Sequence, residues 1–172
     1  MKVLIFGNLA SGKSYLANKI CENIPDLEYL TIDDFRRKFG DGSMEKENLS
    51  KQTFLNSIIP NKFQLIEASG FGDTGVKIAQ LLQQTSEHKI IFMLRISLET
   101  CLKRLEKRVW NIPYPAPHEQ VFLLAKRTNK LINNNSINSI WSQVKNAQII
   151  EIQTITDNKI RKIIQIIEIK KQ

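Results

Sequence analysis

The strongest constraint on the fold of this chain lies near its start. Residues 7–14 read Gly-Asn-Leu-Ala-Ser-Gly-Lys-Ser, which matches the pattern G-x-x-x-x-G-K-[ST]. Residues 2–6 before this motif form a short apolar, partly β-branched run that is typical of a buried strand. After the motif, Leu16 and Ile20 continue at helical spacing. The sequence therefore predicts a strand, a tight loop and a helix in direct succession.

A loop of this composition can hold a row of phosphate groups, and we call residues 7–14 the phosphate loop. Its glycines, Gly7 and Gly12, permit close backbone approaches that a Cβ atom blocks. Successive N–H groups then converge on the phosphates, helped by the positive end of the following helix. Lys13 can reach the β- and γ-phosphates, and the Ser14 hydroxyl can bind Mg²⁺. We expect a nucleoside triphosphate, ATP, to bind at Gly7, Asn8, Leu9, Ala10, Ser11, Gly12, Lys13, Ser14 and Tyr15.

The length and composition fit a single domain that spans residues 1–172. Of the 172 residues, 42% are hydrophobic, which is enough for a sizeable core. No apolar run approaches the roughly 20 residues of a membrane span, and the immediate entry into a strand leaves no room for a signal peptide. Cys21 and Cys101 lack a CxxC pattern, which argues against a zinc site or a disulfide framework. We expect buried thiols, a cytoplasmic protein and no membrane partner.

The chain is basic, with a formal net charge of +8 from 25 Lys and Arg against 17 Asp and Glu. Such a surplus is expected of a protein that handles polyanions, whether small phosphorylated molecules or nucleic acid. The net charge alone does not distinguish between these two kinds of partner.

Apolar runs of strand length alternate with segments of helical periodicity along the whole chain. The pattern predicts strands at residues 2–6, 27–32, 63–67, 89–94 and 148–152, and helices at residues 12–23, 44–59, 76–84, 98–110, 118–132, 138–145 and 158–169. A short helix is also expected within residues 33–40. This alternation predicts an α/β fold with a parallel sheet covered on both faces. Ligands of such folds bind outside the carboxyl ends of the strands.

Acidic and basic residues follow the second predicted strand. A carboxylate of Asp33 or Asp34 could accept the proton of an attacking hydroxyl or hold Mg²⁺, and Arg36 could bind an anionic part of the acceptor. We predict Asp33 as the catalytic carboxylate and a metal-linked residue with Ser14, and Asp34 and Arg36 as substrate-binding residues. The alternative is that one of the two aspartates caps the helix that follows.

The third predicted strand ends in Glu67, whose carboxylate should emerge near the phosphate loop. A metal-linked or water-orienting role is one interpretation, and a structural ion pair with a neighbouring arginine is the other. In the turn that follows, Gly70 could let the backbone approach a substrate, although a plain tight turn explains this glycine equally well.

Two arginines at i, i+4 spacing, Arg104 and Arg108, precede a segment with three prolines at residues 112–117. A helix cannot continue through those prolines, so a loop is expected there. Phosphoryl transfer relies on cations that neutralise the moving group, and we predict this role for Arg104 or Arg108. Trp110 and Tyr114 flank the loop, where core or hinge packing is favoured over stacking on a base.

These segments together resemble the P-loop kinase group typified by adenylate and shikimate kinases. The resemblance rests on the phosphate loop, the acidic strand end at Asp33, the glycine-containing turn after Glu67, and residues 102–108, which are similar to the entry of the family's lid. It implies a three-layer α/β/α fold with a five-stranded parallel sheet in the order 2-3-1-4-5. It also implies Mg²⁺ and ATP as donor, a lid at about residues 104–127, and adenine against residues 153–157.

The sequence thus predicts an ATP-dependent phosphotransferase with Lys13, Asp33, Arg104 and Arg108 as catalytic residues. Its acceptor would be the hydroxyl or phosphate of a small metabolite or nucleotide. Asp33 and Arg36 also resemble the D-x-x-R arrangement of polynucleotide 5′-kinases, which keeps a nucleic-acid 5′ end as an alternative acceptor. A nucleotide-dependent regulatory ATPase without an acceptor is the third interpretation.

Overall fold

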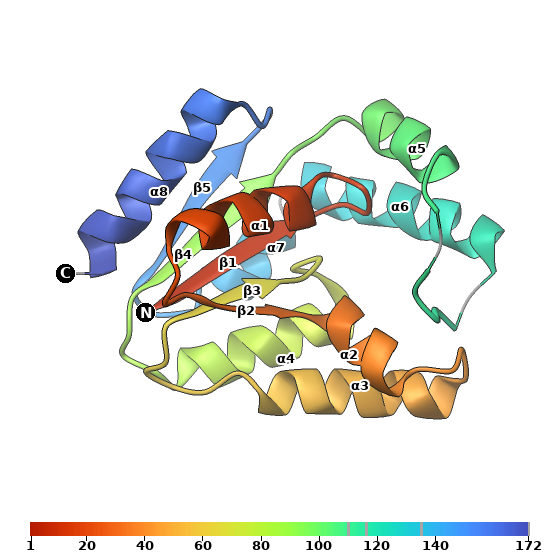
Figure 1. The fold of residues 1–172 in the computed structure, drawn as a ribbon, viewed down its shortest axis with the longest axis horizontal. Helices are drawn as coiled ribbons and strands as arrows, with labels where there is room; N and C mark the ends of the chain where they lie inside the picture. The colour runs from red at the N-terminus through yellow and green to blue at the C-terminus, as the bar shows by residue number, and fades with distance from the viewer. Residues whose placement is uncertain (110, 116, 135, 172) are drawn as a thin grey trace.

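The structure, a computed structural model, describes residues 1–109, 111–115, 117–134 and 136–171 (Figure 1). Five parallel strands form one sheet in the order β2-β3-β1-β4-β5. The strands are β1 (Lys2–Gly7), β2 (Glu28–Thr31), β3 (Gln64–Glu67), β4 (Lys89–Leu94) and β5 (Ala147–Ile152). The helices are α1 (Lys13–Asn23), α2 (Ile32–Phe39), α3 (Met44–Asn56), α4 (Gly72–Gln83), α5 (Leu98–Glu106), α6 (His118–Asn133), α7 (Ser136–Trp141) and α8 (Asp157–Lys171). The predicted fold class and sheet order are confirmed.

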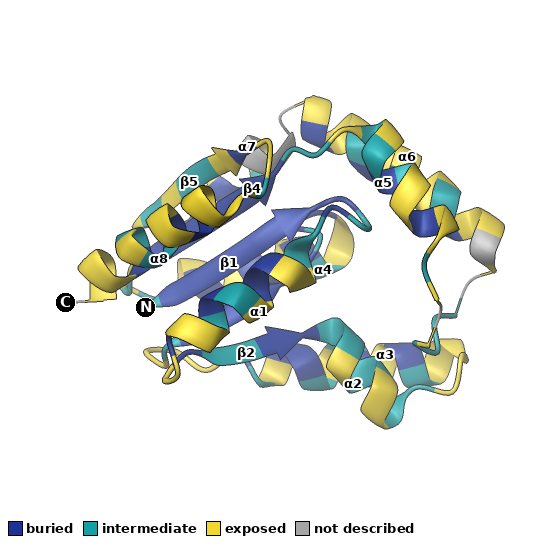
Figure 2. Ribbon diagram, turned by 45° about the horizontal axis from the view of Figure 1, so that its top comes forward, coloured by how far each residue is buried: buried dark blue, intermediate teal, exposed yellow. Residues whose placement is uncertain are grey.

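Each face of the sheet has its own hydrophobic core, because side chains alternate along β1. Val3 and Ile5 point into a core with α1 and α8, whereas Leu4 and Phe6 point into a core with α3, α4 and α7. Strand β1 is buried along its whole length, and the helices that cover it turn exposed residues outward (Figure 2). The apolar run at residues 3–6 within β1 follows from this position in the centre of the sheet.

The register of the strands brings the predicted site residues to one edge. Thr31 at the end of β2 pairs with Glu67 at the end of β3, and Ile5 of β1 pairs with Glu67 from the other side. Asp33 follows Thr31 by two residues, and the phosphate loop begins two residues after Ile5. Three separate segments of the sequence therefore converge around Glu67.

Several element boundaries differ from the sequence prediction. Helix α4 begins at Gly72, four residues earlier than expected, and α7 spans Ser136–Trp141 rather than residues 138–145. Helix α5 ends at Glu106 because the chain must straighten before the prolines. Trp110, the predicted end of that helix, and residue 116 of the predicted proline-containing loop lie outside the described residues. Within the part of the chain that is described, no helix is both long and apolar enough to cross a membrane.

Candidate active site

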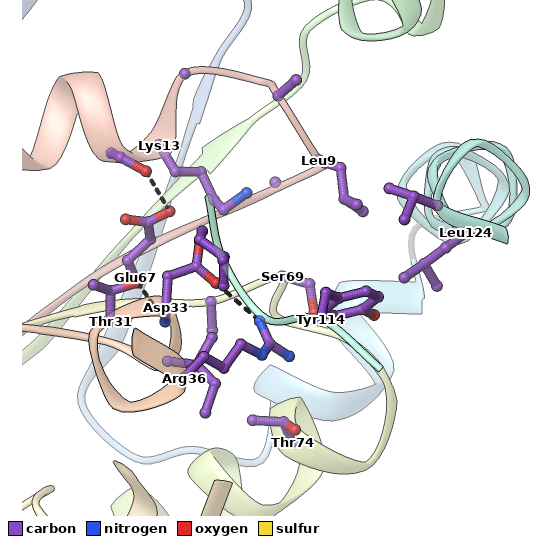
Figure 3. A pocket seen from close by; sticks show the side chains of 18 of the residues that line it. Leu9, Lys13, Thr31, Asp33, Arg36, Glu67, Ser69, Thr74, Tyr114 and Leu124 are labelled. Carbon is purple, nitrogen blue, oxygen red and sulfur yellow. Dashed lines mark hydrogen bonds and ion pairs between the residues drawn. The ribbon is translucent and has the colours of Figure 1, made fainter. Parts of the chain in front are cut away.

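A cavity of about 760 Å³ opens at the carboxyl edge of the sheet. Its size lies in the range that holds a bound small molecule. The phosphate loop, the starts of α1, α2 and α4, the end of β3, and the segment from α5 to α6 all contribute to its walls (Figure 3). The cavity brings together most of the predicted site residues, namely Gly7, Leu9, Ala10, Gly12, Lys13, Ser14, Tyr15, Asp33, Arg36, Glu67, Arg104 and Arg108.

The phosphate loop has the backbone conformation that its glycines predict. Gly12 is the residue before α1 and has a φ of 96°, in the left-handed region that favours glycine. A Cβ at this position would come within 2.9 Å of the Ile155 side chain. The loop therefore turns tightly into the N-terminus of α1, where unpaired N–H groups and the helix dipole favour an anion.

Lys13 extends along the phosphate loop and contacts no carboxylate within ion-pair distance in the described chain. Its Nζ donates to the Asn8 carbonyl oxygen at 2.8 Å. Burial lowers the pKa of Lys13, whereas the nearby charges of Glu67 and Asp33 act to raise it. Because the Lys13 ammonium group bonds a neutral carbonyl, it can pair with an anionic ligand.

Asn8 connects the phosphate loop to α6. Its buried side chain donates through Nδ2 to the Ala125 carbonyl oxygen at 3.0 Å and accepts from the Leu9 N–H through Oδ1 at 2.8 Å. Like Ser11, Asn8 is buried beneath the loop and does not line the cavity. Asn8 holds the loop from behind through these bonds, whereas the buried Ser11 hydroxyl has no hydrogen-bond partner among the described residues.

The Glu67 carboxylate is held between two hydroxyl groups. Ser14 Oγ donates to Glu67 Oε1 at 2.9 Å, and Tyr29 Oη donates to Oε2. Burial, reinforced by the Glu67 charge, raises the pKa of the Tyr29 hydroxyl, so the hydroxyl keeps its proton and remains a donor. Sequence reasoning missed Tyr29, for which the one signal was its place on the second predicted strand.

The Ser14 hydroxyl and the Glu67 carboxylate form an oxygen donor set that fits Mg²⁺. This ion binds proteins through one or two carboxylates together with substrate phosphates and water. Among the described residues, no group of three or more His, Cys, Asp or Glu side chains could hold a metal ion. The pair therefore suits an ion that arrives with a nucleotide. Glu67, rather than Asp33 or Asp34, is the carboxylate that contacts Ser14.

Asp33 occupies the first turn of α2, but it does not cap that helix. Thr31 is the cap, and its side chain accepts from the Asp33 N–H. The Asp33 carboxylate instead accepts a hydrogen bond from Arg36 Nη1 at 2.9 Å and lies 3.7 Å from Arg108 Nη2. Figure 3 shows the Asp33 side chain between those of Glu67 and Arg36, with the Lys13 side chain nearby.

Arg36 makes contacts that the sequence did not predict. Its Nε and Nη2 donate to the two oxygens of Glu47 at 2.8 and 2.6 Å, and its guanidinium lies 4.7 Å from the centre of the Tyr114 ring. Lys51, another residue of the cavity wall, also pairs with Glu47 at 3.1 Å. Tyr114 thus packs in the cavity wall, while Trp110 lies outside the described residues.

Arg104 and Arg108 both line the cavity, although only Arg104 is within α5. Ser97 caps that helix by accepting from the Thr100 N–H, and Arg104 in its last turn reaches the phosphate loop. There Arg104 Nη1 donates to the Ala10 carbonyl oxygen at 3.2 Å. Both arginines are therefore positioned near the place where phosphates would lie.

The structure does not bring Asp34 and Gly70 into the cavity. The helical turn of α2 directs Asp34 to solvent, where it pairs with Arg37 at 2.6 Å. Gly70 is buried with a φ of 83°, and a Cβ there would lie 2.6 Å from the Phe6 ring. Its carbonyl oxygen accepts from Trp141 Nε1 at 3.1 Å. Gly70 is therefore required for packing, in line with the plain-turn alternative, and the substrate-binding roles of Asp34 and Gly70 stay predictions.

Comparison with known proteins locates this fold among small kinases. The chain is similar to shikimate kinase from Acinetobacter baumannii in complex with shikimate, with 18% identity, a TM-score of 0.62, and 97% of this chain and 92% of that chain covered. It is also similar to a gluconokinase from Sinorhizobium meliloti, with 11% identity, a TM-score of 0.61, and 99% and 93% covered. Deoxyadenosine kinase from M. mycoides with bound dATP shares 14% identity at a TM-score of 0.57, with 98% and 100% covered.

No protein-family model matches the sequence, and no curated protein matches it. At these identities the solved structures show a common fold, which is that of small P-loop kinases. The resemblance inferred from the sequence is confirmed at that level.

Proposed function

We propose that this protein is an ATP-dependent phosphotransferase that moves the γ-phosphoryl group of Mg·ATP to a small-molecule acceptor. The observation that carries the proposal is that one cavity contains both the phosphate loop with Lys13 and the carboxylate of Asp33. The kinase neighbours support the same activity, since the shikimate kinase is in complex with shikimate and the deoxyadenosine kinase has bound dATP. The presence of both a donor site and a carboxylate opposite it is what phosphoryl transfer requires.

The cations of the site would bind and neutralise the phosphates. Lys13 would exchange the Asn8 carbonyl for phosphate oxygens, and Arg104 would do the same with the Ala10 carbonyl. Arg108, which lines the cavity beside Asp33, would face the γ-phosphoryl group as it moves. Ser14 and Glu67 would hold Mg²⁺, which when bound shields the charge of the β- and γ-phosphates. We infer that the segment at about residues 104–127 acts as the lid that excludes water.

Asp33 would orient the acceptor hydroxyl and accept its proton. Its carboxylate is held by Arg36, so its position is fixed before a substrate binds. Because Thr31 caps α2, the Asp33 oxygens are not used by the helix N-terminus. This removes the main structural reason for an aspartate at this position.

The experiment that tests the proposal follows the fate of the γ-phosphate of labelled ATP. The purified protein is incubated with Mg²⁺ and a panel of nucleosides, nucleotides, sugars, hydroxy acids and 5′-hydroxyl oligonucleotides. A phosphotransferase predicts label in an acceptor product and faster ATP consumption when that acceptor is present. Release of label only as inorganic phosphate, at a rate that no acceptor changes, would contradict the proposal and favour the regulatory ATPase.

A further inference from the structure

The cations that line the cavity have different partners at its two ends. At the nucleotide end, Lys13 and Arg104 donate to backbone carbonyls, of Asn8 and Ala10 respectively. A carbonyl is neutral, so it leaves the positive charge of each side chain uncompensated by that bond. This end of the cavity is therefore prepared for a strongly negative ligand.

At the other end, the cations already bind carboxylates of the same chain. Arg36 gives Nε and Nη2 to Glu47 and Nη1 to Asp33, so all three of its nitrogen atoms donate to a carboxylate. Lys51 pairs with Glu47 as well, at 3.1 Å. The Arg36 and Glu47 side chains are 12% and 2% exposed, so this is a buried, two-pronged ion pair rather than a surface contact.

The charge balance of this group follows from the hydrogen bonds. The two cations, Arg36 and Lys51, are matched by the carboxylates of Glu47 and Asp33. Arg108, whose Nη2 lies 3.7 Å from the second oxygen of Asp33, is a third cation, and the proposed function assigns it to the moving γ-phosphoryl group. Burial alone would raise the pKa of Glu47, but the bonds and charges of Arg36 and Lys51 outweigh it and hold the pKa below its usual value. The carboxylate thus stays ionised and keeps its partners.

An anionic acceptor would have to compete with this arrangement. If Arg36 turned to a phosphate or carboxylate on the acceptor, Glu47 would remain buried and would lose its two-pronged partner, which is strongly unfavourable. An acceptor that left Arg36 in place would bring its negative charge next to Asp33 and meet like-charge repulsion. Both routes disfavour an acceptor with a net negative charge.

The remaining walls of this end suit a neutral molecule with hydroxyl groups. Thr74 and Tyr114 contribute hydroxyls, and Ile32, Phe71 and Ile112 contribute apolar surface. Figure 3 shows Thr74 and Tyr114 on either side of the space in front of Arg36. Polar groups of this kind bind the hydroxyls of a sugar, a polyol or a nucleoside through hydrogen bonds, without requiring a charge.

We infer that the phosphoryl acceptor is an uncharged hydroxyl compound, a nucleoside or a sugar alcohol, and not a phosphate or carboxylate compound. The inference rests on the proposed function. In this assignment Glu47 holds Arg36, and Arg36 is a positioning residue that holds Asp33 by a direct hydrogen bond. The oxygen of the acceptor hydroxyl forms a bond to the γ-phosphorus of ATP, the bond from that phosphorus to the β–γ bridging oxygen breaks, and the hydroxyl proton passes to Asp33. In this chain the arginine of the D-x-x-R arrangement then binds carboxylates of the protein and does not bind a phosphate of the acceptor.

The first test compares acceptors that differ in charge but share a skeleton. Labelled ATP is offered with adenosine or AMP, thymidine or thymidine 5′-phosphate carrying a free 3′-hydroxyl, and glucitol or gluconate. We expect kcat/KM to be higher for the neutral member of any pair that is phosphorylated, by about tenfold or more. Preferred transfer to an anionic member would overturn the inference while leaving the kinase proposal standing. Failure to bind ATP at all would instead contradict the kinase proposal.

A second test does not depend on having the right acceptor in the panel. With a non-hydrolysable ATP analogue and Mg²⁺ bound, inorganic sulfate is titrated while the Arg36 Nε–H signal is followed by NMR. We expect no saturable change, since this hydrogen bonds to Glu47. Saturable binding of sulfate at Arg36 would overturn the inference even if no compound in the panel is phosphorylated.

A third test removes the negative charge of Glu47, which pairs with Arg36. Glu47→Gln should raise the affinity of sulfate for Arg36 and increase the relative kcat/KM for anionic acceptors by about tenfold. Glu45→Gln, an exposed glutamate on the same helix, is the matched control and should change neither. If Glu47→Gln folds with its thermal midpoint near that of the control but gains no affinity for sulfate, the inference is wrong. If it does not fold, the wild-type titration decides.

Discussion

The two ends of the cavity differ in the hydrogen-bond partners of their cations, and this difference suggests what kind of ligand each end binds. At the nucleotide end Lys13 and Arg104 bond to carbonyls, whereas at the acceptor end Arg36 and Lys51 bond to the Glu47 carboxylate. A cation that bonds a neutral carbonyl can pair with a negatively charged ligand, whereas the charge of a cation that bonds a carboxylate is already compensated in part. We therefore expect a polyanion at the phosphate-loop end of the cavity and a neutral molecule at the other end.

The ends differ also in how the chain builds them. The nucleotide end is largely one continuous segment of eight residues between a strand and a helix. The acceptor end combines Asp33 and Arg36 from α2, Glu47 and Lys51 from α3, and Tyr114 from the segment before α6. Its geometry depends on the packing of elements that are distant in the sequence. We expect substitutions at the two ends to act differently, and four predictions use that difference.

The largest effect is expected at Lys13. Lys13→Ala should lower phosphoryl-transfer turnover by about 10³–10⁵-fold, the range for a cation that stabilises a moving phosphoryl group. The matched control is Lys19→Ala, since Lys19 is a solvent-facing lysine of the same helix that pairs with Glu22. Steady-state kinetics with labelled ATP measures the effect, and circular dichroism confirms the fold. Comparable turnover in the two variants would remove the phosphate loop from the mechanism.

A smaller loss, confined to the chemical step, is expected at Asp33. Asp33→Asn should lower kcat by about 10²–10⁴-fold, because the amide cannot accept the acceptor proton. The Kd for Mg·ATP, measured by calorimetry, should change little. Asp34→Asn removes the exposed neighbouring carboxylate and serves as the control. If Asp33→Asn weakens ATP binding while sparing kcat, Asp33 belongs to the nucleotide end and the contrast between the two ends breaks down.

An effect on metal binding is expected from the hydroxyl that holds Glu67. Tyr29→Phe deletes the donor to Glu67 Oε2 and should weaken Mg²⁺ binding in the nucleotide complex by about tenfold, as is usual when a partner of a metal ligand is removed. Calorimetric titration of ADP with and without Mg²⁺ separates the two contributions. The affinity for metal-free ADP is the internal control and should be unchanged. Equal losses with and without Mg²⁺ would mean that Tyr29 acts on the loop as a whole.

The smallest expected effect concerns stability and leaves the chemistry alone. Gly70→Ala should lower the free energy of unfolding by about 1–3 kcal/mol more than Gly42→Ala, because its Cβ would overlap the Phe6 ring. Gly42 has a similar φ, 90°, but a Cβ there meets nothing within 4 Å, so it isolates the cost of the backbone conformation. Urea unfolding measures both. A loss of acceptor affinity in folded Gly70→Ala protein would restore the substrate-binding interpretation of this glycine.

The backbone of the phosphate loop and its place at the carboxyl edge of the sheet could be predicted from the sequence, because both follow from a local pattern. The glycines, Lys13 and Ser14 are fixed by their spacing in one loop, and the alternation of strands and helices was enough to predict the edge where they lie. Glu67 was identified as a candidate for the metal for the same reason, since it ends a buried strand. The sequence alone could not show that Glu67, and not Asp33, contacts Ser14, because this contact depends on the register of β3 against β1.

The acceptor end could not be predicted to the same depth. Glu47 was overlooked because a glutamate in a helix is usually a solvated surface residue. A signal was present, since Glu47, Ser50 and Phe54 recur at helical spacing and all three are buried. What it pairs with depends on the packing of α3 against α2, which no local pattern gives. Gly70 was assigned to the substrate for a related reason, because the Phe6 ring that requires it is distant in the sequence.

The central claim is that the phosphate loop and Asp33 face each other across one bound triphosphate. A crystal structure with Mg²⁺ and a non-hydrolysable ATP analogue tests it most directly. The account predicts that the phosphate tail lies on residues 7–14, that Lys13 Nζ leaves the Asn8 carbonyl for phosphate oxygens, and that the terminal phosphate faces Asp33. A triphosphate bound elsewhere, or a terminal phosphate directed away from Asp33, would contradict it.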